Sequence, residues 1–381
     1  MEQRIYHLLS DLVACNSINP TLADGPGEHA IALLIATMLQ AVGIAPDVQE
    51  VSAGRSNVVG TLRGRGEAPP LLLNAHIDTV GVEGMETPFT LRREDDRLYG
   101  RGAYDMKGSA AVMLALAEHF ADRPPPGDVL LTFVADEEDR SLGTEYLVRH
   151  WLPTLETPPA AAIVLEPTEE QIGVAHKGFA WLEIDVEGRA AHGSRPDEGI
   201  DAALPLGAAL NTLAALSREL LDVPVDPLLG HASLHVGRLQ GGTAWSVYPA
   251  HARLGWERRT LPGEGEATLR DELDRVVQAV AEAPGNHRVT GRIVFIRLPH
   301  LVATRSLPVH LLQQARPDTP IGGVAFWADS ALLGEHVPTV VYGPRGHGAH
   351  AVDEWVSLRS LVRLYETMVE VCNTAQRRRP A

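Results

Sequence analysis

Histidine and acidic residues follow the apolar runs of this sequence at several separate places. In chain order they are His76, Asp78, Asp136, Glu137, Glu138, Asp139, Glu166, His347 and His350. A further aspartate, Asp105, lies in the glycine-rich stretch "GRGAYDMKG". Histidine and carboxylate ligands without cysteine are typical of a catalytic zinc site rather than of a closed structural one. A set of two histidines and three carboxylates, drawn from these residues, has too many ligands for one ion that keeps an open coordination position. Such a set suffices for two ions that share a bridging carboxylate.

The apolar runs before these residues predict the strands of one sheet. Runs such as "LLLNA", "LLTFVA", "AAIVL" and "TVVYG" are separated by helical stretches, which indicates a mostly parallel sheet flanked by helices. In an open α/β sheet, functional groups gather beyond the carboxyl ends of the strands. Each feature alone has a plainer explanation, as a turn or a solvated charge run. Together they predict that the histidines and carboxylates meet at one edge of the sheet.

The spacing within each group assigns only some of the roles. His76 and Asp78 are two residues apart at the end of a strand, so their side chains point to the same face. Asp78 is therefore well placed to orient the imidazole of a metal-binding His76. Neighbours on a strand face opposite ways, so spacing does not decide which of Glu137 and Glu138 binds metal and which is a general base. It also does not distinguish the two histidines of "GHGAH".

The pattern of the sequence changes between residues 177 and 296. The stretch "AWLEIDVEG" alternates apolar and polar residues, as expected of an antiparallel strand with one exposed face. The segments that follow predict a small two-layer α+β domain of order β-α-β-β-α-β, with helices over residues 198–220 and 266–283. We therefore divide the chain into a catalytic domain, residues 1–176 and 297–381, and an inserted domain, residues 177–296.

Composition excludes two classes of partner. The 33 Lys and Arg against 49 Asp and Glu give a net charge of −16, and no basic block precedes "RRR" at 377–379. Nucleic acid or an anionic membrane would need a clustered positive surface. The N-terminus lacks the order of a signal peptide, and the two cysteines, Cys15 and Cys372, form no disulfide framework. We expect a cytoplasmic protein with neither nucleic acid nor membrane as its partner.

Six motifs of the sequence resemble those of the dinuclear zinc M20 metallopeptidases. They are "NAHIDTV", "GRGAYDMKGSAA", "ADEEDRSLG", "VLEPT", "HKGFAWLEIDVEGRAAHGSRPDEGIDA" and "GHGAHAVDEWV", and they span residues 74 to 355 in the family's order. The similar branch contains acetylornithine deacetylase, succinyl-diaminopimelate desuccinylase and glutamate carboxypeptidase. The resemblance implies an enzyme that hydrolyses the amide bond of an N-acyl amino acid with a metal-bridged water. It also implies two divalent metal ions, zinc by preference, with cobalt or manganese as alternatives.

The resemblance assigns the metal ligands position by position. His76 and Glu166 are implied to hold one ion, and Glu138 and His350 the other, with Asp105 bridging both. The histidine choice comes from the family pattern "AH…DE", which "AHAVDEW" matches. The family often has a cis peptide bond after the bridging aspartate.

The resemblance also implies roles outside the ligand set. Glu137 is implied to be the general base and Asp78 the supporting acid. His192, in "AAHGS", is implied to stabilise the oxyanion in the site of a partner subunit, in a homodimer formed through the inserted domain. Arg259, in "WERRTLPG", is implied to bind the substrate carboxylate. Its neighbour Arg258 is the alternative, because strand alternation points only one of the two inward.

Two residues depart from the family pattern. Ser246, in "GGTAWSVYP", occupies a substrate-contacting position where asparagine is common in the deacetylase and desuccinylase branches, and Arg140 replaces a usual glycine. The first departure leaves the substrate open between an N-acyl amino acid and a short peptide. A dipeptidase or carboxypeptidase with the same dinuclear site is thus the alternative function. A non-catalytic metal-binding relative, or a plain α/β protein with an acidic rim, is the remaining hypothesis.

Overall fold

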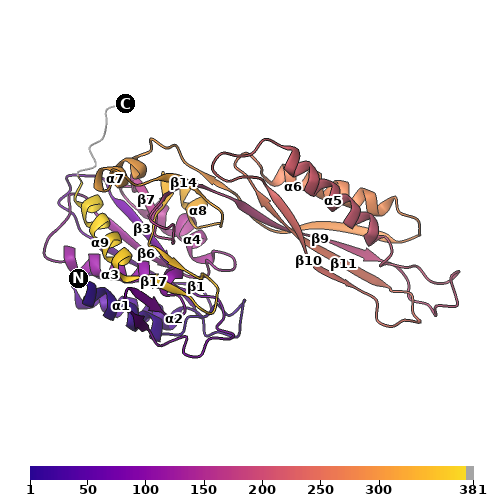
Figure 1. The fold of residues 1–381 in the computed structure, drawn as a ribbon, viewed down its shortest axis with the longest axis horizontal. Coiled ribbons are helices and arrows are strands. Elements are labelled where there is room, and N and C mark those ends of the chain that lie inside the picture. Colours follow the sequence, from indigo (N-terminus) through magenta and orange to yellow (C-terminus); the bar gives the residue numbers. More distant parts are fainter. Residues whose placement is uncertain (375–381) are drawn as a thin grey trace. The chain divides into compact units, whose positions relative to one another are not determined.

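The computed structural model describes residues 1–374, so the "RRR" tripeptide and the last residues of the expected catalytic segment lie outside the described residues (Figure 1). The chain forms two compact units. The first comprises Met1–Val174, Val302–Gly322 and the residues from Ala328 onward. The second comprises Ala175–Leu301 and Gly323–Trp327. The second unit is therefore inserted into the sequence of the first.

The large sheet, most of which belongs to the first unit, is parallel at its centre. Its strand order is β1-β2-β6-β3-β7-β15-β8-β13, and β14 pairs with β8. The strands are β1 Asp47–Ser52, β2 Arg55–Leu62, β3 Leu71–His76, β6 Val129–Val134, β7 Ala161–Val164, β8 Ile172–His176, β13 His300–Leu301, β14 Ile321–Val324 and β15 Thr339–Val341. Strands β6, β3, β7 and β15 are parallel, whereas β1, β2, β8 and β13 pair antiparallel. The predicted fold class is confirmed, with the parallel order confined to the central strands.

Helices cover both faces of this sheet. They are α1 Glu2–Ala14, α2 His29–Ala41, α3 Gly108–Phe120, α4 Leu142–Tyr146, α7 Leu307–Ala315, α8 Ser330–Gly334 and α9 Leu358–Asn373, with the short segments η1 Ala103–Lys107, η2 Leu147–Trp151 and η3 Leu152–Thr154. Leu71 and Leu73 of β3 belong to the main core with α1, α2, α3 and α9. Leu72 lies in a second core with residues of η2, η3 and α8. Because β3 is buried on both faces, it begins with three consecutive leucines rather than with an alternation of apolar and polar residues.

A smaller antiparallel sheet brings two distant loops together. Its order is β16-β17-β5-β4, with β4 Arg92–Glu94, β5 Arg97–Tyr99, β16 Gly346–His347 and β17 Trp355–Ser357. The loop between β16 and β17 carries His350, and the segment after β5 carries Asp105. Trp355 pairs with Tyr99 in the β17–β5 ladder. This pairing joins the C-terminal part of the chain to the Asp105 segment.

The second unit is a two-layer α+β structure. Its sheet has the order β10-β11-β9-β12, with β9 Gly178–Glu187, β10 Ser233–Gly241, β11 His251–Thr260 and β12 Arg288–Arg297. Helices α5 Leu206–Asp222 and α6 Glu266–Ala281 lie side by side on one face of this sheet (Figure 1). Ala180, Leu182 and Ile184 of β9 are buried in the core with residues of both helices. The alternation of "AWLEIDVEG" therefore corresponds to one covered face and one uncovered face.

The predicted N-terminal boundary of one helix of the second unit was wrong. The helix expected over residues 198–220 begins only at Leu206. Asp201 Oδ1 accepts hydrogen bonds from the two backbone N–H groups of residues 203 and 204, at 2.8 and 3.0 Å. An aspartate that bonds to the backbone in this way competes with helix formation, and Pro205 favours a helix that begins directly after it. Among the described residues, no helix combines the length and apolar character needed to cross a membrane.

Candidate metal centre

Six of the side chains expected from the sequence converge beyond the strand ends of the first unit. They are His76 at the end of β3, Asp105 in η1, Glu137 and Glu138 after β6, Glu166 after β7, and His350 between β16 and β17. The ligand atoms of His76, Glu137 and Glu166 all lie within 4.8 Å of one another. Those of His76, Asp105 and Glu138 are equally close. Residues 76 and 350, which are 274 positions apart in the sequence, therefore meet beyond the strand ends. This is where functional groups of an open α/β sheet gather.

Asp105 lies at the centre of this cluster, between the two histidines. Its Oδ1 is 2.9 Å from His76 Nε2, and its Oδ2 is 3.4 Å from His350 Nε2. Glu166 Oε1 lies 3.6 Å from His76 Nε2, and Glu138 Oε2 lies 2.8 Å from His350 Nε2. One histidine and one glutamate therefore stand on each side of a shared carboxylate. The peptide bond after Asp105 is cis, as the resemblance implies.

The electrostatics of the cluster show an excess of buried negative charge. Burial, and then the nearby Asp105 carboxylate, raise the pKa of Glu138 to about 7. Burial, followed by the charge of Glu166, raises the pKa of Glu137 well above its ordinary value. Hydrogen bonds to Asp105 and Glu138 raise the pKa of His350 to about 10. A set of largely buried carboxylates with one buried imidazole and one that is 55% exposed, short of positive partners, fits divalent metal ions.

Asp78 holds the turn that carries the two glutamates. Its carboxylate is fully buried and accepts the backbone N–H of Glu137 at Oδ1 (3.1 Å) and of Glu138 at Oδ2 (3.2 Å). The amide of Asn19 also donates to Oδ2, at 2.9 Å. His76 Nδ1 lies 3.1 Å from the backbone oxygen of Asp78 and 3.5 Å from its Oδ1. The backbone oxygen of Asp78 is thus its closer contact with the imidazole, and its carboxylate anchors the glutamate turn, which spacing did not predict.

A buried network that the sequence did not predict lies behind this turn. Asn19 Nδ2 also donates to Asp136 Oδ1, at 3.0 Å. Arg55 donates to the same oxygen at 2.7 Å and to Glu28 through its Nε at 2.5 Å. Asp136 itself has a positive φ of 66°, which is uncommon for a residue other than glycine. Asp136 belongs to the acidic run that the sequence singled out, whereas Asn19, Glu28 and Arg55 share no motif and come from distant segments, so no sequence signal pointed to them.

His347 lies apart from the cluster. Its side chain is 65% exposed, and its Nε2 is 3.8 Å from Asp353 Oδ2. His350, in contrast, contacts both Asp105 and Glu138. Tertiary structure therefore separates two histidines that spacing alone left equivalent.

Two of the expected substrate-contacting residues lie on adjoining loops of the second unit. His192 is exposed, and its Nδ1 is 2.8 Å from Ser194 Oγ. The backbone N–H of Gly193 donates to the backbone oxygen of Ser246 at 2.7 Å. His192 also forms an isolated bridge with Val247. The structure therefore brings His192 and Ser246 together.

The two neighbouring arginines of β11 point to opposite faces of the sheet. Arg258 is fully buried on the helix side, where its guanidinium contacts Glu272 at 3.1 Å. Arg259 is on the other face, where its Nε is 2.7 Å from Glu257 Oε1. The Arg259 guanidinium also lies 5.3 Å from the centroid of the Phe179 ring. Only Arg259 is thus accessible to a ligand.

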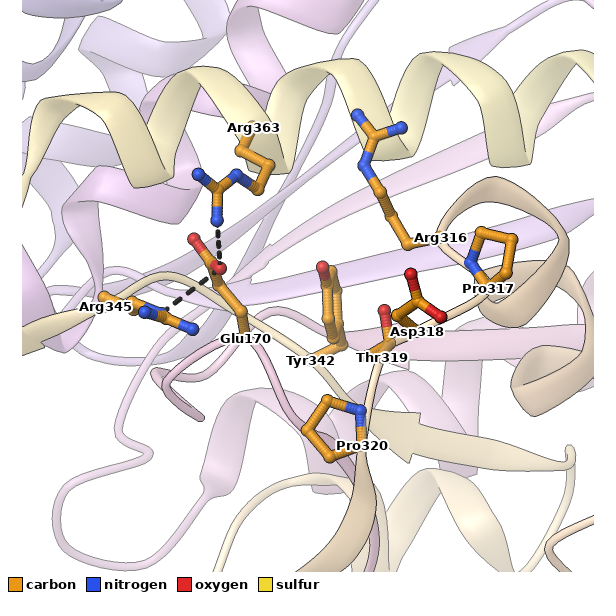
Figure 2. Close-up of a pocket in the computed structure, with 9 residues that line it drawn as sticks. All are labelled: Glu170, Arg316, Pro317, Asp318, Thr319, Pro320, Tyr342, Arg345 and Arg363. Carbon is orange, nitrogen blue, oxygen red and sulfur yellow. Dashed lines mark hydrogen bonds and ion pairs between the residues drawn. The ribbon is translucent and has the colours of Figure 1, made fainter.

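A cavity of about 220 Å³ in the first unit is separate from this cluster (Figure 2). It is lined by Glu170, Arg316, Pro317, Asp318, Thr319, Pro320, Tyr342, Arg345 and Arg363. Glu170 Oε2 lies 2.6 Å from Arg363 Nη1 and 3.2 Å from Arg345 Nε. None of the residues that line it is a member of the metal cluster, and its charged groups largely neutralise one another.

Comparison with known proteins places these features in a wider context. A model of peptidase family M20/M25/M40 matches residues 72–374. Acetylornithine deacetylase of Photorhabdus laumondii subsp. laumondii is 29% identical over 368 residues, covering 92% of each chain. An M20 family metallo-carboxypeptidase from Sulfolobus solfataricus has a similar fold, with a TM-score of 0.78 and 18% identity over 98% of this chain and 99% of that chain. A dinuclear metal binding peptidase from Bacillus subtilis has a TM-score of 0.70 at 18% identity, covering 98% and 97%.

Proposed function

The chain belongs to peptidase family M20/M25/M40 and is therefore a hydrolase acting on amide bonds, and on this premise we propose that it deacylates an N-acyl amino acid. The observation that carries the proposal is the placement of His76 with Glu166, and of His350 with Glu138, on either side of Asp105. Similarity to acetylornithine deacetylase along 92% of the chain favours a deacylase.

The residues present suit two divalent ions, zinc by preference. His76 and Glu166 would hold one ion, Glu138 and His350 the other, and Asp105 both. Bound ions of this kind lower the pKa of water and polarise a carbonyl oxygen. Binding would also displace the protons that the buried carboxylates retain, because metal ligands must be deprotonated.

Glu137 is the group that moves the proton in this proposal. Its carboxylate takes a proton from the attacking water as the carbon–oxygen bond forms, and delivers it to the amine nitrogen as the carbon–nitrogen bond breaks. The products are a carboxylate and a free amine. A carboxylate oxygen of Glu137 lies within 4.8 Å of ligand atoms of His76 and Glu166, which places the proposed base beside the ion site. Asp78 assists by fixing the backbone N–H groups of Glu137 and Glu138.

Residues of the second unit complete the proposed site. We assign His192 of the partner subunit to the oxyanion that develops in the transition state. Arg259 binds the substrate carboxylate, for which a planar two-pronged donor is suited. Ser246 lies beside His192 and contacts the substrate in place of the more common asparagine.

We infer a homodimer formed through the second unit. Its strand β10 is an edge of the sheet and is almost entirely exposed. Exposed apolar residues occur on this strand and on α5, including Leu239 (56%) and Leu221 (60%). An exposed edge strand with neighbouring apolar side chains favours pairing with a second copy.

A substrate panel tests the proposed activity. Metal-free protein is reloaded with Zn²⁺ and assayed against N-acetyl amino acids, the same compounds with an amidated carboxyl group, and dipeptides. We expect hydrolysis of the free N-acetyl amino acids, loss of activity with a chelator, and recovery with added Zn²⁺. Faster cleavage of dipeptides would favour the dipeptidase or carboxypeptidase alternative. Activity that a chelator does not affect would contradict a metal-dependent mechanism.

A further inference from the structure

Glu354 makes an unusual set of contacts beside the metal centre. It lies four residues after His350, directly before β17, and its side chain is fully buried. Its Oε2 accepts hydrogen bonds from the Arg101 guanidinium (2.7 Å) and the Gly102 backbone N–H (3.0 Å). Its Oε1 accepts the backbone N–H groups of Tyr104 (2.9 Å) and Asp105 (3.1 Å). One carboxylate therefore binds four donors from five consecutive residues.

The segment that Glu354 holds is irregular. Gly102 has a positive φ of 77°, and a Cβ there would lie 2.8 Å from Thr79 Cγ2. Asp105 and Met106 have non-helical backbone angles. Backbone N–H groups in such a buried, irregular segment need acceptors from elsewhere. Glu354 supplies these acceptors, and charge-assisted bonds to a carboxylate are the strong kind.

The contacts of Glu354 connect both sides of the cluster. The backbone of Asp105 is held by Glu354, while the Asp105 carboxylate contacts His76 and His350. His350 and Glu354 belong to the same short segment between β16 and β17. A displacement of Glu354 would therefore move the central carboxylate relative to both histidines.

We propose that Glu354 is a positioning residue of the metal centre, which fixes the backbone of Asp105 so that its two carboxylate oxygens face both ion sites. The inference rests on the proposed function, in which Asp105 bridges two ions. It concerns metal affinity, which can be measured without any substrate.

The first test is a Co²⁺ titration of the metal-free full chain, followed by visible absorption and calorimetry. In Glu354→Gln the charge and one acceptor oxygen are lost at nearly constant volume. We expect the dissociation constant of the more weakly bound Co²⁺ ion to rise by about 10- to 100-fold. This is the usual loss of metal affinity when a group that orients a metal ligand is removed. Thermal unfolding in chelator establishes that the variant is folded.

Glu354→Asp separates positioning from simple charge. This variant keeps the negative charge but is one methylene shorter, so it cannot reach all four donors. Positioning predicts that it also weakens Co²⁺ binding. If Glu354→Asp binds Co²⁺ as the wild type does while Glu354→Gln does not, the effect is one of charge and the proposal is wrong.

Glu170→Gln is the matched control. Glu170 is also a largely buried carboxylate with arginine partners, Arg345 and Arg363 (Figure 2). It also accepts a hydrogen bond from Ser360 at 2.7 Å. Its substitution should leave Co²⁺ affinity within a few-fold of wild type. An equal loss of affinity in this control would overturn the assignment to Glu354.

The remaining outcomes distinguish this inference from the proposed function. Wild-type Co²⁺ affinity in both Glu354 variants overturns the inference and leaves the function intact. Loss of the fold in both variants makes Glu354 a structural residue and also overturns it. Weakened Co²⁺ binding in both Glu354 variants, with a wild-type chain that hydrolyses no N-acyl amino acid, supports the inference and contradicts the proposed substrate class. A wild-type chain that binds no Co²⁺ contradicts both.

Discussion

At the scale of single residues, Glu137 differs from the other carboxylates of the cluster in the role that we propose for it, that of general base rather than metal ligand. If Glu137 is the proposed general base, Glu137→Gln should retain the wild-type metal content and reduce kcat by about 10²- to 10⁴-fold, the range of general acid–base catalysis. Steady-state kinetics with metal analysis on the same sample measures both. Asp139→Asn, in the same acidic run, is the control and should stay within a few-fold of wild type, since Asp139 pairs with Arg140. Activity of Glu137→Gln close to wild type would show that the base is another residue.

The raised pKa values predict how pH affects the stability of the metal-free protein. The pKa of Glu138 is about 7 against an ordinary 4.5, and that of Glu28, raised chiefly by burial, is also about 7. The folded state therefore binds more protons than the unfolded state, and the stabilisation is complete below pH 4.5 and lost as pH rises through 7. The raised pKa of His350, about 10 against 6.5, acts in the same direction at higher pH.

We therefore expect the free energy of unfolding of the metal-free protein to fall as pH rises from about 5 to 8. Urea denaturation at several pH values measures it. Added Zn²⁺ should reverse the trend, because deprotonated ligands bind metal more tightly. A metal-free protein that becomes more stable over this range would contradict the electrostatic account of the cluster.

At the scale of elements, Arg55 joins three segments that are far apart in the sequence. It begins β2, and it contacts Glu28 before α2 and Asp136 after β6. Arg55→Met would leave both carboxylates buried without their cation. Removal of one partner of a buried ion pair costs about 3–5 kcal/mol, and we expect a loss of that size in urea denaturation of the full chain.

The control for this prediction is an exposed ion pair. Arg65 pairs with Glu67 at 2.7 Å, and both side chains are about half exposed. Arg65→Met should change the free energy of unfolding far less than Arg55→Met does, because solvent screens such exposed pairs. Equal losses in the two variants would show that the Arg55 network contributes no more than a surface pair.

Some elements could be predicted from the sequence and others could not. The fully apolar runs at β3, β6 and β7 predicted buried strands, because continuous burial leaves a continuous pattern. The start of α5 was predicted too early because the apolar periodicity continues on the N-terminal side of Pro205. In that stretch, hydrogen bonds from a side chain to the backbone form a turn instead of a helix. The short strands β16 and β17 have too few residues to carry a period.

At the scale of the whole molecule, the proposed role of His192 in a partner's site predicts complementation. A heterodimer of Glu137→Gln and His192→Ala subunits, isolated with two different tags, has one site with both residues intact. It should show about half the activity of the wild-type dimer, because each site of a two-fold dimer takes one histidine from the other subunit. Each homodimeric variant should be nearly inactive.

The same heterodimer also tests the opposite arrangement. If His192 acts in its own subunit, neither site of the heterodimer is intact, and its activity should equal the mean of the two inactive parents. Leu239→Glu, at the exposed edge strand β10, should shift the protein toward monomers in light scattering. A fully active monomer would contradict both the dimer and the assignment of His192.

The sequence by itself determined the chemistry of this protein, because residue types and their order along the chain carry it. Histidines and carboxylates after apolar strands, in six motifs of a known family, predicted the candidate ligands, the candidate base and the α/β fold. Tertiary structure decided what depends on contacts between distant segments. It separated His350 from His347. It also placed Asn19 against Asp78, and Glu354 against the Asp105 segment. Hydrogen bonds between residues tens to hundreds of positions apart leave no periodicity or local spacing, so only the folded chain reveals them.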